Sequence, residues 1–176
     1  MWAGEWRLSH RADPDALPLA DRHYNRQKVG APQFVPPGRC VVLISVCERA
    51  FWITSWPFAE YVKHAWAGAW VCSAFRNEGA GLSSELIREA VAATRAIWPD
   101  VPALGLVTFV DPTFVRTTNP GCCYRAAGFK RATPRTTEAG LPAFQLLPAD
   151  MPPAEAALPA LPRPERFYSY VPKEPR

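Results

Sequence analysis

Compact apolar runs separated by polar, glycine-rich or proline-rich breaks dominate the pattern of this chain. Several of the runs are rich in β-branched and aromatic residues, which is typical of buried strands, and they cover residues 40–46, 50–56, 69–75 and 104–110. The short polar break at Glu48-Arg49 indicates that the first two strands form a hairpin. Leu82, Leu86 and Ala90 recur at helical spacing, so a helix is predicted from 82 to about 98.

Weaker patterns lie toward the two ends. Residues 2–8 alternate roughly and predict a first strand. The start at Asp13-Pro14 suits a helix that carries Leu17 and Tyr24. Asn119, Pro120 and Gly128 are the expected cap, first residue and stop of a further short helix. Two last strands are predicted at 129–133 and 143–147, followed by an extended segment.

Composition limits the number of domains. The 176 residues, 48% hydrophobic and 12% aromatic, are enough for one folded domain with a real core. Many of the 20 prolines follow residue 130, so we expect a folded α/β domain over 1–148 and a proline-rich tail over 149–176. An aromatic patch at 167–170 is expected to dock this tail onto the body of the protein.

Charge, cysteine content and hydropathy limit the possible partners and the cellular compartment. A formal net charge of +4 permits a polyanionic partner without requiring one. The five cysteines form no Cys-x-x-Cys pair, and no secretory signal is visible, which favours a reducing compartment. No apolar run reaches the length of a membrane span. The sequence therefore predicts a soluble, cytoplasmic protein with no membrane partner, and leaves its oligomeric state, homodimer included, open.

The break after the run at 69–75 has the composition of an anion-binding turn. Gly79 and Gly81 lie between a predicted strand and a predicted helix, where backbone amides and the helix dipole favour phosphate. The Gly-Lys-Ser/Thr of nucleotide-triphosphate loops is absent. A dinucleotide-binding turn is also disfavoured, because it needs a third glycine and an acidic strand end. An ordinary glycine-containing turn remains an alternative.

The spacing Arg76-x-x-Gly79-x-Gly81 resembles the pyrophosphate-binding turn of the GNAT superfamily of N-acetyltransferases. Tyr124 followed by Gly128-Phe129 is similar to the end of that fold. The resemblance implies a GNAT fold, with a mixed, mostly antiparallel central sheet flanked by helices. It implies acetyl-CoA or a related CoA thioester as cofactor, with Tyr124 in the position that protonates the departing thiolate. The implied cofactor-binding residues are Phe75, Arg76, Gly79, Gly81, Leu82 and Ser83.

A narrower resemblance is to the Mom-like phage DNA-modification proteins. It rests on the segments His23–Arg26, Gln33–Gly38, Phe75–Glu78 and Val110–Pro112. It implies a transferase that carbamoylmethylates the exocyclic amine of adenine in DNA, which protects phage DNA from restriction in the cytoplasm of a phage-infected or lysogenic bacterium. A base inside a duplex is inaccessible, so the adenine must be flipped out and held.

The narrower resemblance also implies the residues that perform the chemistry. The candidate catalytic residues are His23, Tyr24, Asp111 and Tyr124. His23, Tyr24 and Asp111 are candidate ligands of iron, since one imidazole and oxygen donors suit that metal. Without a metal, His23 and Asp111 become proton acceptors.

Two other functions remain open from the sequence. One is an acetyl-CoA-dependent N-acetyltransferase that acts on a small amine or a protein N-terminus. The other is a nucleic-acid-binding protein without catalysis. DNA functions are favoured if the basic residues share one face with the cleft, and these are Arg22, Arg26, Lys28, Arg116, Arg125, Lys130, Arg131 and Arg135.

Overall fold

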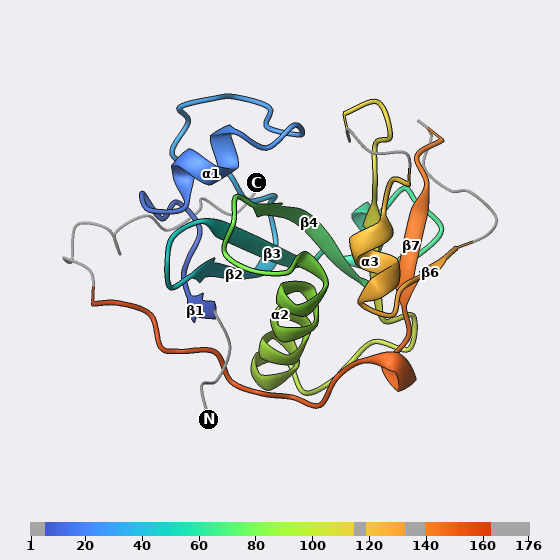
Figure 1. Cartoon of the computed structure of the whole chain (residues 1–176). Coiled ribbons are helices and arrows are strands. Elements are labelled where there is room, and N and C mark those ends of the chain that lie inside the picture. Colours follow the sequence, from blue (N-terminus) through green and yellow to red (C-terminus); the bar gives the residue numbers. More distant parts are fainter. Residues whose placement is uncertain (1–5, 115–118, 133–139, 163–176) are drawn as a thin grey trace.

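The computed structural model describes residues 6–114, 119–132 and 140–162. These form one seven-stranded mixed sheet in the order β1-β2-β3-β4-β5-β7-β6, with helices against both faces (Figure 1). The strands are β1 (Trp6–Leu8), β2 (Arg39–Ser45), β3 (Ala50–Trp56), β4 (Trp70–Asn77), β5 (Leu106–Phe109), β6 (Lys130–Arg131) and β7 (Ala143–Leu146). The helices are α1 (Leu17–Asp21), α2 (Ser83–Ile97) and α3 (Cys122–Ala126), with 3₁₀ turns at Ala59–Tyr61 and Pro148–Asp150. The expectation of a mixed, mostly antiparallel sheet flanked by helices is confirmed.

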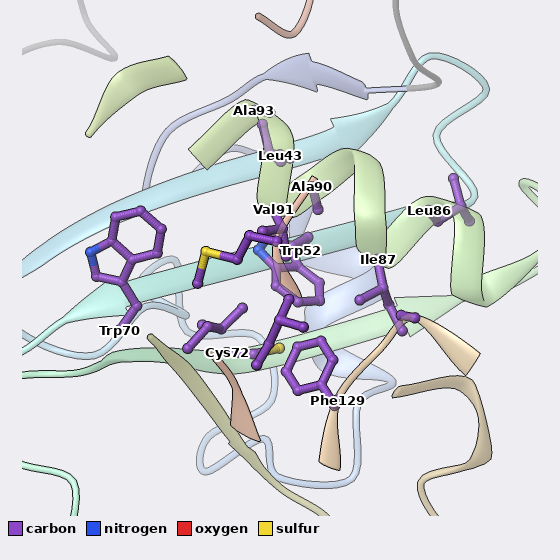
Figure 2. Packing of buried hydrophobic residues seen from close by; sticks show 14 of the residues in the cluster. Leu43, Trp52, Trp70, Cys72, Leu86, Ile87, Ala90, Val91, Ala93 and Phe129 are labelled. Carbon is purple, nitrogen blue, oxygen red and sulfur yellow. The ribbon is translucent and has the colours of Figure 1, made fainter. Parts of the chain in front are cut away.

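Two apolar layers lie on opposite faces of the sheet. Side chains alternate along a strand, so Trp52 of β3 faces α2 whereas Phe51 and Ile53 face α1. The larger layer packs the apolar face of α2 against β2, β3 and β4 (Figure 2). Its labelled members are Leu43, Trp52, Trp70, Cys72, Leu86, Ile87, Ala90, Val91, Ala93 and Phe129. Burial on both faces explains why the central runs are almost continuously apolar.

The parallel pair at the centre of the sheet is short. β4 and β5 pair only at Trp70↔Leu106 and Val71↔Val107, although β4 continues to Asn77. Just beyond this pair, Ser73 is an extra residue in β4, because Thr54 lies opposite Cys72 while Ile53 lies opposite Ala74. A bulge of this kind disrupts pairing locally and bends the strand. The C-terminal half of β4 therefore has β3 on one side and an opening, bounded by the end of β5, on the other.

The two short helices differ from their predicted bounds. α1 ends at Asp21, so Tyr24 follows the helix instead of lying in it. α3 begins at Cys122 with Gly121 as its cap, and the predicted cap Asn119 lies in the preceding turn. Gly121 has φ +82°, and a Cβ there would overlap the Phe144 ring, so this close approach requires glycine.

The first part of the proline-rich segment is extended, as predicted, and runs along α2 and the edge of the sheet. Met151 is buried in the main apolar layer. Glu155 N donates to Ala92 O at 3.1 Å, and Leu158 exchanges backbone hydrogen bonds with Trp6 and Leu8 at 3.0 and 2.8 Å. Residues 167–170 and the start of the first predicted strand lie outside the described residues. Within the described ranges, no helix has the length and apolar character needed to cross a membrane.

Candidate functional site: the open edge of β4

The segment that follows α1 lies along the open half of β4. Asn25 Nδ2 donates to Ser73 O at 2.9 Å, and Arg76 Nη1 donates to Arg22 O at 2.8 Å. The His23 imidazole hydrogen-bonds the Asn25 side chain and the backbone of Phe75. Polar groups of β4 that lack a strand partner are thus satisfied by residues 22–25.

His23 is a buried contact residue of this segment. Burial lowers the pKa of its imidazole, and the hydrogen bonds to Asn25 and the Phe75 backbone oppose that shift. The residue is only 8% exposed, and its ring stacks on Tyr24 with 4.6 Å between ring centroids. The predicted catalytic His23 is therefore placed in the site as a largely neutral group that joins α1 to β4.

Tyr24 and Asp111 come together from opposite sides of the opening. The Tyr24 ring also stacks in parallel on Phe114, at 5.5 Å and 3°. Burial raises the pKa of Tyr24, and a hydrogen bond with the backbone of Asp111 opposes that shift. Asp111 Oδ1 accepts hydrogen bonds from Thr113 N at 2.9 Å and Thr113 Oγ1 at 2.6 Å. Tyr24 and Asp111 are therefore neighbours, as two predicted site residues, but the Asp111 carboxylate already accepts hydrogen bonds from Thr113 in its own turn.

The three residues named as ligands of iron are hydrogen-bonded to protein groups in this structure. Nδ1 of His23 already contacts Asn25, and the imidazole also bonds the Phe75 backbone. Asp111 Oδ1 accepts a hydrogen bond from Thr113 N. Within the described parts of the chain, no group of three or more His, Cys, Asp or Glu side chains is placed to hold a metal ion. We therefore assign no chemical step to iron.

Tyr124 lies between the two diverging strands. It projects from α3, with its hydroxyl 3.8 Å from Cys72 Sγ of β4 and hydrogen-bonded to the Thr108 side chain of β5. Burial raises the pKa of Tyr124 well above its usual value and raises that of the Cys72 thiol to about 12. Both groups stay protonated at neutral pH, so Tyr124 can donate a proton to an anion formed in the opening.

The turn between β4 and α2 is organised by Asn77. Its Oδ1 accepts hydrogen bonds from the amides of Gly79 and Ala80, and its Nδ2 donates to Gly81 O and Ser83 Oγ, at 2.8 to 3.1 Å. Gly79 has φ +100°, which favours glycine. The turn is thereby fixed without using the amides at the start of the helix.

Those helix-start amides remain available to a ligand. α2 is 15 residues long, and its N-cap residue, Leu82, makes no side-chain capping bond. The first intrahelical amide bond runs from Leu86 N to Leu82 O, so the preceding amides have no acceptor within the helix. Gly81, Leu82 and Ser83, all predicted cofactor-binding residues, thus lie at an uncapped helix N-terminus that suits an anion.

The arginines near this turn differ in their ion pairs. Arg76 pairs with Glu78, and Arg22 binds the same carboxylate through Nε and Nη2 at 2.8 and 2.7 Å. Arg49, which the sequence did not single out, has Nη1 3.9 Å from the position that a Cβ on Gly79 would take. No described side chain forms an ion pair with Arg49. Arg49 is therefore the available cation beside the turn, while Arg76 holds the segment after α1 in place.

We expect Glu78→Gln to destabilise the fold in a pH-dependent manner. Its two arginine partners lower the pKa of Glu78 from 4.5 to about 2, so the ionised carboxylate stabilises the fold above pH 4.5 and this contribution disappears as the pH falls toward 2. The carboxylate is partly exposed, so we expect a loss of about 1–2 kcal/mol in unfolding free energy at pH 7. Urea titrations from pH 7 to pH 2.5 measure it. Glu60→Gln, at an exposed site, is the control, and a loss that stays constant below pH 4 would contradict this role.

A pocket lies on the α1 face of β3 and β4. Its volume is about 400 Å³. Phe51, Ile53, Ser73 and Ala74 line it from the sheet, while the segment after α1 and the loop 33–37 line it from the other side. Because Ser73 is the bulge residue, the pocket ends where β4 leaves β5. The loop 33–37 therefore forms one wall of the pocket.

The predicted basic residues lie in two places. Arg22 and Arg26, beside the pocket, are paired with Glu78 and Asp21. Arg125 and Arg131 lie over the Phe144 ring at the α3–β6 end of the sheet, at 5.5 and 6.0 Å. Arg116 and Arg135 are outside the described residues.

Comparisons with protein-family models, curated proteins and solved structures find no match to this chain. The fold and site define a mixed α/β protein. Its mostly antiparallel seven-stranded sheet opens beside β4, next to an uncapped helix N-terminus and a pocket.

Proposed function

We propose that this protein is a GNAT-type transferase that uses a CoA thioester to modify the exocyclic amine of adenine in DNA. One observation carries the proposal: a single strand, β4, connects a glycine turn at a helix N-terminus, an edge that β5 does not pair with and that the segment after α1 contacts, and a pocket of about 400 Å³. The turn follows Asn77, the edge begins after Val71, and the pocket meets the strand at Ser73. The sheet order and the turn support the GNAT assignment, and the pocket supports a planar acceptor.

The carrier is proposed to lie along the open half of β4. Its diphosphate binds the amides before Leu86, close to Arg49, which no described side chain pairs with. From Asn77 to Ser73 the strand spans about 13 Å at ~3.3 Å per residue, a length that an extended pantetheine arm covers. The thioester then lies near the bulge, with Tyr124 on one face of the sheet and the pocket on the other.

The arrangement suits acyl transfer to a weak nucleophile. The adenine amine shares its lone pair with the ring, so it must be held close to the thioester carbon. In the proposed step the amine nitrogen forms a bond to that carbon, the carbon–sulfur bond breaks, and Tyr124 donates its proton to the thiolate. The amine proton leaves to water, from which Tyr124 is reprotonated.

We expect DNA from cells that express this protein to contain modified adenosine. A carbamoylmethyl group, which the Mom-like resemblance implies, contains an amide nitrogen that acetyl transfer does not supply, so the two products differ in mass. Mass spectrometry of digested nucleosides measures this, with Tyr124→Phe as the inactive control. An acetyl increment supports acyl transfer onto DNA by the step above. A carbamoylmethyl increment supports action on adenine in DNA but contradicts that step, because this group is joined to the amine through a methylene carbon and not through the thioester carbon. Unmodified nucleosides alongside folded protein contradict action on DNA.

A second function is favoured because Arg22 and Arg26, the basic residues nearest the pocket, already form ion pairs with Glu78 and Asp21. A plain N-acetyltransferase that acts on a small amine or a protein N-terminus needs no basic surface. Binding to DNA separates the two, because phosphate contacts make affinity fall steeply with salt. Salt-sensitive DNA binding supports DNA as the substrate, and the absence of binding at low salt supports the small amine.

A further inference from the structure

One polar side chain of the pocket has an unsatisfied buried atom. Gln33 lines the pocket, and its Oε1 is buried without a hydrogen-bond partner in the described parts of the chain. The only other such atoms within the described ranges are His10 Nε2 and Trp70 Nε1, and neither residue lines this pocket. A buried acceptor without a partner is costly in a folded protein, so a ligand that supplies a donor is favoured at this position.

The surroundings hold the Gln33 backbone in place. Arg26 Nη1 donates to Gln33 O at 3.0 Å, and Arg26 Nε is paired with Asp21 Oδ1 at 2.8 Å. Arg26 also donates to Ala31 O. The backbone of the loop that carries the Gln33 side chain is therefore braced without a ligand.

The rest of the pocket is suited to an aromatic ring. The Phe34 and Phe51 rings meet edge to face at 6.3 Å and 89°, and Val35 and Ile53 extend the apolar lining. Flat apolar walls with a few placed polar groups are typical of pockets that bind small planar molecules. The pocket volume of about 400 Å³ lies within the usual range for such sites.

We propose that Gln33 is the residue that selects adenine. In this assignment Oε1 accepts a hydrogen bond from the exocyclic N–H, and Nε2 donates to the adjacent ring nitrogen. A glutamine amide offers the donor and the acceptor side by side that adenine matches. Guanine carries a carbonyl oxygen in place of that amine, which sets two acceptors against each other. This inference rests on the proposed function and names the residue through which the same site recognises its substrate.

The bond to Oε1 also fixes the direction of the amine. One N–H is held by Gln33, so the nitrogen lone pair and the second hydrogen are restricted in orientation before attack. Gln33 thus acts as a specificity-determining residue that contacts the base.

The test compares Gln33→Leu with the wild-type full chain on short single-stranded oligonucleotides. Each holds one variable base, either adenine, purine (which lacks the amine) or guanine, in a constant sequence of pyrimidines. Fluorescence anisotropy at fixed low salt gives the affinities. We expect the wild type to bind the adenine strand roughly 10- to 100-fold more tightly than the other two, and Gln33→Leu to bind all three alike. Gln145→Leu, which removes an amide at a remote position in β7, should retain the preference.

The same samples are also incubated with acetyl-CoA and analysed by mass spectrometry. Adenine modified by both wild type and Gln33→Leu, with unchanged base preference, overturns the role of Gln33 and leaves the proposed function intact. A Gln33-dependent adenine preference without modification keeps the inference and contradicts the proposed transfer. Equal affinity of the wild type for all three strands overturns the inference whatever the modification result. A melting curve for each variant confirms that it is folded.

Discussion

Replacing Tyr124 with phenylalanine should lower the turnover number for transfer by about 100- to 1,000-fold, while the protein stays folded. The substitution removes only the hydroxyl that lies between Cys72 of β4 and Thr108 of β5. Without it the departing thiolate has no proton donor on that side of the opening. Release of free CoA thiol, followed with a thiol reagent, measures the rate. The KM for the carrier should change little, because the proposed site of its diphosphate is at the distant turn.

A pH profile tests the protonation state of Tyr124, and the turnover of the Tyr124→Phe variant tests whether its hydroxyl acts as an acid. Since burial raises the pKa of Tyr124 well above its usual value, the wild-type rate should show no loss from its ionisation between pH 7 and pH 9. Tyr61→Phe is the matched control, because that side chain is 74% exposed and lies away from the opening. A Tyr124→Phe enzyme with wild-type turnover would assign Tyr124 to packing against Phe75 and Phe129 alone.

Local patterns predicted most of the sheet. Apolar runs placed β2, β3 and β4 within about two residues, and the helical spacing from Leu82 placed α2 almost to the residue. These elements could be predicted because the burial of one helix face and of the strands produces a regular spacing of apolar residues in the sequence. The start of α3 was predicted wrongly, because it is set by the approach of Gly121 to Phe144, which lies more than twenty residues further along the chain.

The site was only partly predictable for the same reason. The glycine turn and Tyr124 belong to recognisable motifs, whereas Arg49 lies in a hairpin turn whose sequence gives no sign of a binding role. Arg49 reaches the turn between β4 and α2 only because Ala50 of β3 pairs with Asn77 of β4. The pair His23-Tyr24 can likewise be noticed in the sequence. The hydrogen bond of His23 to the Phe75 backbone, however, depends on the part of β4 beyond Val71 that β5 does not pair with. Register between distant strands decides which polar groups meet, and a single sequence does not display it.

The junction at the base of the opening depends on a glycine that precedes β5. Gly105 O accepts the amide of Trp70 at 2.9 Å, so this residue joins β4 to β5 where their parallel pairing begins. Its φ is +68°, and a Cβ there would overlap the carbonyl oxygen of Leu146 on β7. Relief would require β5 and β7 to separate, and the buried Leu106 and Leu146 would then lose packing.

Gly105→Ala is therefore expected to reduce the unfolding free energy by about 4 kcal/mol or more, a large part of the ~5–15 kcal/mol that holds a typical domain together. At ~2–4 °C per kcal/mol for a chain of this size, the melting temperature should fall by about 10 °C or more. Gly140→Ala is the matched control, since Gly140 has nearly the same φ of +67° and nothing within 4 Å of the added Cβ. It should show only the left-handed backbone cost of about 1–2 kcal/mol. If the two variants melted together, the contact with Leu146 would not constrain this junction, and the opening beside β4 would need another cause.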